Sequence, residues 1–152
     1  MTMNTVIPTG PVTISVDLAV AAYRVEDGFF SSLSPSETLE SAERYQKFLA
    51  LIQKHPEAII APTRDIDEMW HLHMLHPVAY YHDCMSSFGE IIDHDGGFGS
   101  EPEEAPVLAA TFEHTAHLWQ QEYGEPYVSN DEGSVKCTRN CVSRCKRACK
   151  TT

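Results

Sequence analysis

The sequence of 152 residues lacks any long apolar run and has few basic residues outside its last 17 positions. No segment approaches the roughly 18 to 20 apolar residues that span a membrane, and no basic N-terminal region precedes a hydrophobic one. None of the five cysteines forms a CxxC pair, and the eight glycines are too few and too irregular for a phosphate-binding loop. These absences predict a cytoplasmic protein with no membrane partner.

Charge is divided unevenly along the chain. Residues 1–135 carry all 22 acidic residues against five basic ones, a net charge of −17, whereas the last 17 residues carry six basic residues and no acid. Phosphate binding depends on a positive field, so the acidic part argues against nucleic acid as a partner. With 42% hydrophobic residues, the chain can form one ordinary hydrophobic core without disulfide bonds or a structural metal ion to stabilise it.

Hydrophobic periodicity and capping residues predict an all-α protein. The best-marked helix start is Ser34-Pro35-Ser36-Glu37, an N-cap followed by proline at the first helical position and glutamate at the third, with an apolar stripe running to about residue 54. A shorter helix is expected from Asp17 to near Gly28, and a later one from about Pro106 to Tyr123. We therefore expect a single-domain bundle of about five helices, with a C-terminal helix or flexible tail.

Residues 65–84 are the organising element of the chain, because four of the eight histidines lie between residues 71 and 82. Asp65 can cap a helix whose third residue is Glu68, and Pro77 can begin a second helix that Gly89 ends. Two helices that meet at a proline form a corner. The histidines of this corner are the main candidates for chemistry.

Spacing along the first of these helices separates the candidate ligands. Asp67 and His71 are four residues apart and share a face, whereas His71 and His73 diverge by about 200°. A metal ion held by both His71 and His73 would therefore need an irregular backbone between them, or further ligands from elsewhere in the chain. His94 and Asp95 are among the nearest further donors.

A longer series of residues in a fixed order runs through this corner and beyond it. Its parts are Asp65-Ile-Asp67, Trp70-His71-x-His73-Met-Leu-x-Pro77, Tyr80-x-x-Asp83-Cys84, Phe88-Gly89 and Asp93-His94-Asp95. The series resembles the core of the glycine-rich domain-containing protein-like (GRDP-like) family, in its bacterial stand-alone form, and the likeness extends from roughly residue 35 to 127. It implies a helical domain over residues 14–127, after an extended arm of residues 1–13 and before a linker and basic tail of residues 128–152. The chain departs from the family in having no glycine-rich region and in its cysteine-rich tail.

The positions shared with this family favour His71, His73 and His94 as ligands of one transition-metal ion, with Asp67 as a fourth ligand or as the group that orients an imidazole. Imidazole and carboxylate suit zinc, copper or iron. The alternative interpretation is that these histidines cap helices and hydrogen-bond to carboxylates. Cys84 could serve as a thiolate nucleophile beside a histidine, but its place on an apolar helix face predicts a buried, inert thiol.

The tail contains a strict four-residue repeat formed by Cys137, Cys141, Cys145 and Cys149. On a helix the four sulfurs would form one stripe, with neighbouring Cβ atoms about 5 to 6 Å apart, which suits bridging Cu(I) or Zn(II) better than an unstrained disulfide. The flanking lysines and arginines favour thiolates. Disulfides to a partner protein and modification of the tail by an enzyme are the alternatives.

Two classes of function follow from these motifs. One is a metal-handling or carrier protein whose cysteine tail is the active part, and the other is an enzyme with a mononuclear metal at the corner formed by residues 67–94. Open coordination positions beside a pocket would favour the enzyme, whereas a closed site would favour the carrier.

Overall fold

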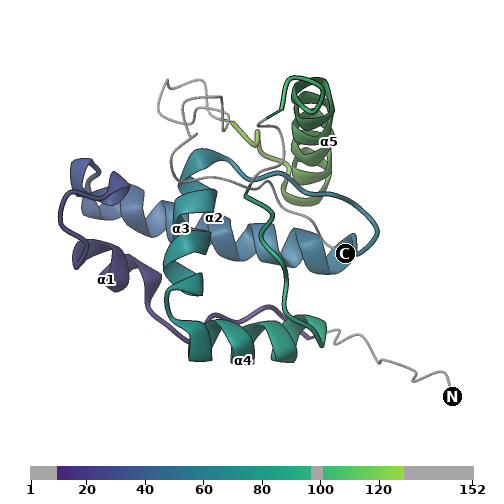
Figure 1. Cartoon of the computed structure of the whole chain (residues 1–152). Helices are drawn as coiled ribbons and strands as arrows, with labels where there is room; N and C mark the ends of the chain where they lie inside the picture. The colour runs from purple at the N-terminus through teal and green to yellow at the C-terminus, as the bar shows by residue number, and fades with distance from the viewer. Residues whose placement is uncertain (1–9, 97–100, 129–152) are drawn as a thin grey trace, which may run out of the picture.

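The computed structural model describes residues 10–96 and 101–128, which form a mostly helical single domain (Figure 1). Its helices are α1 (Leu18–Tyr23), α2 (Pro35–Lys54), α3 (Arg64–Met74), α4 (Pro77–Phe88) and α5 (Ala105–Tyr123), with a 3-10 helix η1 (Phe29–Ser32) between α1 and α2. No β-strand occurs within the described ranges. The prediction of an all-α fold with about five helices is confirmed, and the predicted C-terminal helix or tail lies outside the described residues.

Several helix ends lie at the residues that the sequence predicts. The Ser34 hydroxyl accepts a hydrogen bond from the Glu37 backbone N–H, and the Glu37 carboxylate accepts one from the Ser34 backbone N–H at 2.7 Å, which completes a capping box at the start of α2. Gly89 and Gly124 cap the C-termini of α4 and α5 with φ angles of 75° and 66°. Glycine is favoured there because most other residues are strained in the left-handed region.

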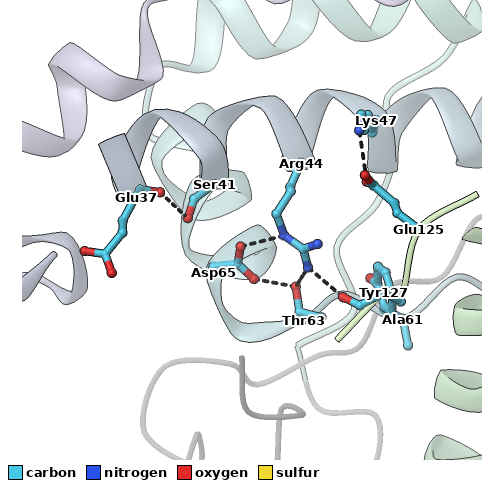
Figure 2. A network of polar contacts seen from close by, with 9 residues as sticks. All are labelled: Glu37, Ser41, Arg44, Lys47, Ala61, Thr63, Asp65, Glu125 and Tyr127. Carbon is cyan, nitrogen blue, oxygen red and sulfur yellow. Dashed lines mark hydrogen bonds and ion pairs between the residues drawn. The ribbon is translucent and has the colours of Figure 1, made fainter. Parts of the chain in front are cut away.

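Two helix boundaries differ from the prediction. Helix α1 ends at Tyr23 instead of near Gly28, and the chain then turns into η1. Helix α3 has Thr63 as its N-cap, so the prediction that Asp65 caps it is wrong. The Asp65 carboxylate instead accepts hydrogen bonds from the Arg44 guanidinium on α2 and from the Thr63 hydroxyl (Figure 2). A tertiary contact has therefore taken the side chain that the local pattern assigned to a cap.

The core lies where α3 crosses α2 (Figure 1). Helix α4 begins near the end of α3 and runs away from it, and α5 lies on the opposite side of α2 from α4. The largest fully buried side chains are aromatic: Tyr45 and Phe48 from α2, Trp70 from α3, Trp119 from α5 and Tyr127 from the segment after α5. Burying such rings supplies much of the favourable free energy of a domain of this size. Helices α2 and α3 thus meet through these rings and form the central support of the domain.

Two extended segments complete the domain around this support. The N-terminal segment, residues 10–16, is held to α2 and α4 because the Gln46 side chain donates to the Val12 carbonyl and Ser15 donates to the Asp83 carboxylate. The chain after α4, residues 89–96, runs back from the end of α4 toward α3 (Figure 1), and its residue His94 reaches that helix. This return segment brings together residues that are 27 positions apart in the sequence.

Candidate metal centre

Asp67, His71 and His94 converge at one edge of α3. Asp67 and His71 stand four residues apart on the same face of the helix, and the His71 Nε2 atom lies 3.5 Å from the Asp67 Oδ2 atom. The His94 Nε2 atom lies 2.7 Å from the other carboxylate oxygen, Oδ1. One potential ligand atom from each residue lies within 4.8 Å of the other two. Among the described residues, this is the group of side chains that could hold a metal ion.

Packing around the three side chains fixes their orientation. The side chains of Asp67 and His94 are 1% and 5% exposed, and that of His71 is 22% exposed. The His94 ring contacts the His71 ring, with centroids 4.8 Å apart, and meets the Trp70 ring in a T-shaped arrangement, with centroids 4.6 Å apart. The group therefore has a buried side against Trp70 and an accessible side at His71.

Two successive hydrogen bonds hold the return segment beside α3. The Trp70 indole N–H donates to the Tyr80 hydroxyl at 2.9 Å, and this hydroxyl donates to the Ile92 carbonyl. Ile92 is two residues before His94, and its side chain is buried. Because the same tryptophan ring also touches His94, α3 and α4 together determine where this imidazole lies.

His73 does not join the other two histidines, which corrects the prediction that all three share one ion. Helix α3 is regular through this region, so His71 and His73 point in divergent directions, as a 3.6-residue period requires. Both ring nitrogens of His73 are occupied, Nδ1 by the Tyr45 hydroxyl at 2.8 Å and Nε2 by the Asp83 carboxylate at 2.8 Å. The ring is fully buried, and a metal ion could reach neither nitrogen without breaking these bonds.

The contacts of His73 define its protonation. A carboxylate only accepts, so Nε2 carries the proton donated to Asp83, and Nδ1 accepts the proton of the Tyr45 hydroxyl. Burial lowers the pKa of His73, although the hydrogen bond to Asp83 and its charge act in the opposite direction. Ser15 donates to the same Asp83 oxygen from both its backbone N–H and its hydroxyl. His73 is therefore a neutral structural residue that ties α2, α3, α4 and the N-terminal segment together.

Arg44 holds the N-terminal end of α3 against α2, close to the Asp67 carboxylate. Its guanidinium donates to the Asp65 carboxylate at 3.0 Å, to the Thr63 hydroxyl at 3.2 Å and to the Tyr127 carbonyl at 2.9 Å (Figure 2). The group also lies over the rings of Trp119 and Tyr127, at 5.3 and 5.7 Å from their centroids. The first turn of α3 is thus fixed to α2 two residues before the candidate ligand at position 67.

A cavity of about 300 Å³ adjoins the candidate site. Its walls come from α1, the turn after it, η1 and the outer face of α3, and the lining residues are Ala22, Val25, Gly28, Phe29, Phe30, Glu68, His71, Leu72 and Leu75. His71 belongs both to the cavity wall and to the group of potential ligands. The sequence did not predict this cavity, because no local pattern relates residues 22–30 to residues 68–75.

The cysteine predictions have two outcomes. Cys84 is 2% exposed, and burial raises the pKa of its thiol, so this residue is poorly suited to act as a thiolate nucleophile. The tail cysteines Cys137, Cys141, Cys145 and Cys149 lie outside the described residues. Their use in metal binding therefore stays a prediction.

Comparisons with known proteins agree with the resemblance seen in the sequence. The chain is 30% identical to glycine-rich domain-containing protein 1 of Arabidopsis thaliana in an alignment of 118 residues, which covers 71% of this chain and 14% of that protein. It is 31% identical to glycine-rich domain-containing protein 2 of the same plant in an alignment of 121 residues, which covers 73% of this chain and 15% of that protein. The chain thus spans about a seventh of the length of these relatives, and no solved structure matches it significantly.

Two further findings bear on the class of protein. Among the described residues, no helix combines the length and the hydropathy needed to cross a bilayer. Residues 12–83 match the family described as glycine-rich domain-containing protein-like, a range that includes α1 to α3 and most of α4. The chain therefore carries a domain of the GRDP-like family.

Proposed function

We propose that this protein binds one divalent transition-metal ion through Asp67, His71 and His94. The observation that carries the proposal is the convergence of two imidazoles and one carboxylate, with the carboxylate oxygens 2.7 and 3.5 Å from the two Nε2 atoms. Ligand atoms bound to one ion at about 2 Å lie at most roughly 4 Å apart. The three potential ligand atoms lie within 4.8 Å of one another, and binding an ion would replace the hydrogen bond between His94 Nε2 and Asp67 Oδ1.

The donor set narrows the choice of ion. Two imidazoles with one carboxylate occur at catalytic zinc sites and at non-haem iron sites, and imidazole also suits copper. A cation would neutralise the charge of the buried Asp67 carboxylate. Three protein ligands leave at least one position of a four-coordinate ion open.

A metal-handling or carrier role is the hypothesis that involves both the cysteine tail and the histidine corner. The tail thiols of Cys137, Cys141, Cys145 and Cys149 would bind soft ions such as Cu(I) or Zn(II), and the histidine corner would bind a divalent ion. In this role a partner protein that donates or accepts the metal is expected to meet the tail. A metal-dependent enzyme is the second candidate, and the cavity at His71 specifically favours it because an open coordination position would face a space of molecular size.

Metal titration of a variant whose four tail cysteines are replaced by serine separates the two sites. In this background we expect one equivalent of Zn(II) or Co(II) per chain, measured by equilibrium dialysis and elemental analysis. Replacing either His71 or His94 by glutamine should weaken that affinity by more than about tenfold, because each change removes a ligand. The matched control is His82→Gln, which removes an exposed imidazole from α4 and should leave the affinity unchanged.

Two results would count against the proposal. Equal affinities in all three histidine variants would show that the corner does not hold the ion. A stoichiometry near zero in the cysteine-free background, with uptake by the unmodified chain, would place metal binding in the tail alone. The reverse result, equal uptake with and without the tail cysteines, would remove the tail from the proposal and leave the corner.

A further inference from the structure

We infer that the cavity beside His71 is a binding site for a small molecule with an apolar body and an oxygen-containing head group that completes the coordination of the metal. This inference rests on the proposed metal site and adds to it the class of ligand. Its starting observation is that one imidazole is shared. The His71 ring both lines the cavity and stands in the candidate ligand group, so an ion held there would border the cavity.

Polarity is graded along the α3 wall of the cavity. Glu68 and His71 are three residues apart and share one face of the helix, and Leu72 and Leu75 continue that wall toward the C-terminus. From Glu68 to Leu75 the helix rises about 10 Å, at 1.5 Å per residue. The polar groups thus lie toward one end of this wall and the aliphatic groups toward the other. A molecule aligned with the wall would place a polar head near the metal and an apolar body beside the leucines.

The opposite wall is apolar and is held firmly in place. It is built from Ala22 and Val25 of the α1 region and from Phe29 and Phe30 of η1, whose rings meet edge to face with centroids 5.0 Å apart. The Arg64 guanidinium lies over the Phe29 ring at 4.8 Å from its centroid. These contacts restrict both rings, so this wall can stay in place when the cavity is occupied.

Gly28 shows how closely the turn behind this wall is packed. A Cβ atom at this position would stand 2.9 Å from the Val25 Cγ1 atom, closer than real Cβ contacts occur. Asp27, the residue before it, has a φ of 56°, in the left-handed region. The turn from α1 into η1 is therefore closely packed. Residues on both sides of this turn, Val25 before it and Phe29 after it, line the cavity.

The size and mouth of the cavity define the ligand further. A volume of about 300 Å³ is at the lower end of the range for small-molecule sites, which fits a molecule of one ring with a head group. Val25 and Leu75 line the cavity and are 42% and 74% exposed, so they mark its opening to solvent. Apolar side chains at an opening favour an apolar ligand, because entry removes both surfaces from water.

Hydroxamates of two sizes test this inference directly. Benzohydroxamate and acetohydroxamate carry the same oxygen head group, but only the first has a ring. Each would be titrated into the full chain with serines at the four tail positions and Co(II) bound, and binding would be followed through the visible bands of cobalt. We expect benzohydroxamate to bind at least about tenfold more tightly, because its ring leaves water for the cavity.

Variants at the mouth distinguish the cavity from an intrinsic preference of cobalt for one hydroxamate. The double variant Val25→Gln with Leu75→Gln should reduce the affinity ratio toward one, while the cobalt bands without hydroxamate stay unchanged. The control is Val107→Gln, which makes the same kind of change at an exposed valine on α5, outside the cavity lining, and should keep the ratio. Absence of cobalt bands would overturn the metal site and this inference together. Cobalt bands with an equal ratio in all variants would overturn the ligand site alone.

Discussion

Single side chains in this protein take their roles from the helix face on which they stand. His71 and His73 are separated by one residue, yet the first is partly exposed beside Asp67 and the second is fully buried between Tyr45 and Asp83. The motif presents them as a pair, but the helical period sends them to opposite sides of α3. The candidate metal site and the structural network therefore use histidines two positions apart without sharing a side chain.

The buried network offers a test at the scale of one hydroxyl. Tyr45→Phe removes the donor to His73 Nδ1 and leaves this acceptor buried without its present partner, which should cost about 1 to 3 kcal/mol of unfolding free energy. Urea denaturation at neutral pH measures this loss. Because the change lies outside the candidate metal group, affinity for Zn(II) should stay within about twofold of the parent.

Tyr81→Phe is the matched control for this prediction. It removes the hydroxyl of a tyrosine that is 49% exposed on α4, and surface changes of this kind usually alter stability by less than about 0.5 kcal/mol. Equal denaturation midpoints for the two variants would contradict the structural role assigned to His73. A strong loss of Zn(II) affinity in Tyr45→Phe, with the fold retained, would instead bring His73 back into the metal site.

At the scale of elements, the ends of helices were predictable where the signal is local. Ser34 and Glu37 fix the start of α2, and Gly89 and Gly124 end α4 and α5, because a cap depends on residues within one turn of it. The start of α3 was not predictable in this way. Asp65 has the local chemistry of a cap, but Arg44 binds it from another helix, and no pattern within residues 60–70 records that contact.

In the candidate site, too, some features follow from the local sequence and others depend on the tertiary structure. The shared face of Asp67 and His71 follows from their spacing, and the divergence of His73 follows from the same geometry. The arrival of His94 depends on the path of the return segment, which the Trp70, Tyr80 and Ile92 contacts determine. The cavity depends on how α1 and η1 pack against α3, so only the assembled structure shows it.

The capping box gives a pH-dependent prediction for α2. The hydrogen bond from the Ser34 backbone N–H lowers the pKa of Glu37 below its ordinary value of 4.5. A carboxyl group with a lowered folded-state pKa stabilises the fold above its unfolded pKa, and this contribution is lost as the pH falls through the folded-state value. Glu37→Gln should therefore be less stable than the parent at neutral pH, and the difference should shrink below about pH 4.

Thermal denaturation at a series of pH values between about 3 and 7 measures this difference. The control is Glu40→Gln, which removes one exposed negative charge from the same helix without touching the capping box. A difference between Glu37→Gln and the parent that is constant across the series would contradict the assigned linkage. So would an equal pH dependence in the two glutamine variants.

At the scale of the whole molecule, one guanidinium joins parts of the chain that the sequence keeps far apart. Arg44 on α2 binds Thr63 and Asp65 at the start of α3 and the carbonyl of Tyr127 after α5, a residue 83 positions away (Figure 2). The Arg44 and Asp65 side chains are 15% and 14% exposed, so solvent screens this pair little. By contrast, Lys47, one turn further along α2, pairs with Glu125 after α5, and these two side chains are 42% and 44% exposed.

Replacing each of these two cations of α2 by methionine should therefore lower the unfolding free energy by unequal amounts. Arg44→Met should lower the unfolding free energy by about 2 to 4 kcal/mol, because Asp65 and the Tyr127 carbonyl lose a nearly buried donor. Lys47→Met should cost less than about 1 kcal/mol, as exposed ion pairs do. Arg44→Lys should recover only part of the loss, since an ammonium cannot reproduce the planar fork that meets three oxygens. Because Arg44 also positions the first turn of α3, its methionine variant should bind Zn(II) more weakly even where it is folded. Equal losses in the two methionine variants, measured by urea denaturation, would show that the joint between α2, α3 and the C-terminal segment does not depend on Arg44.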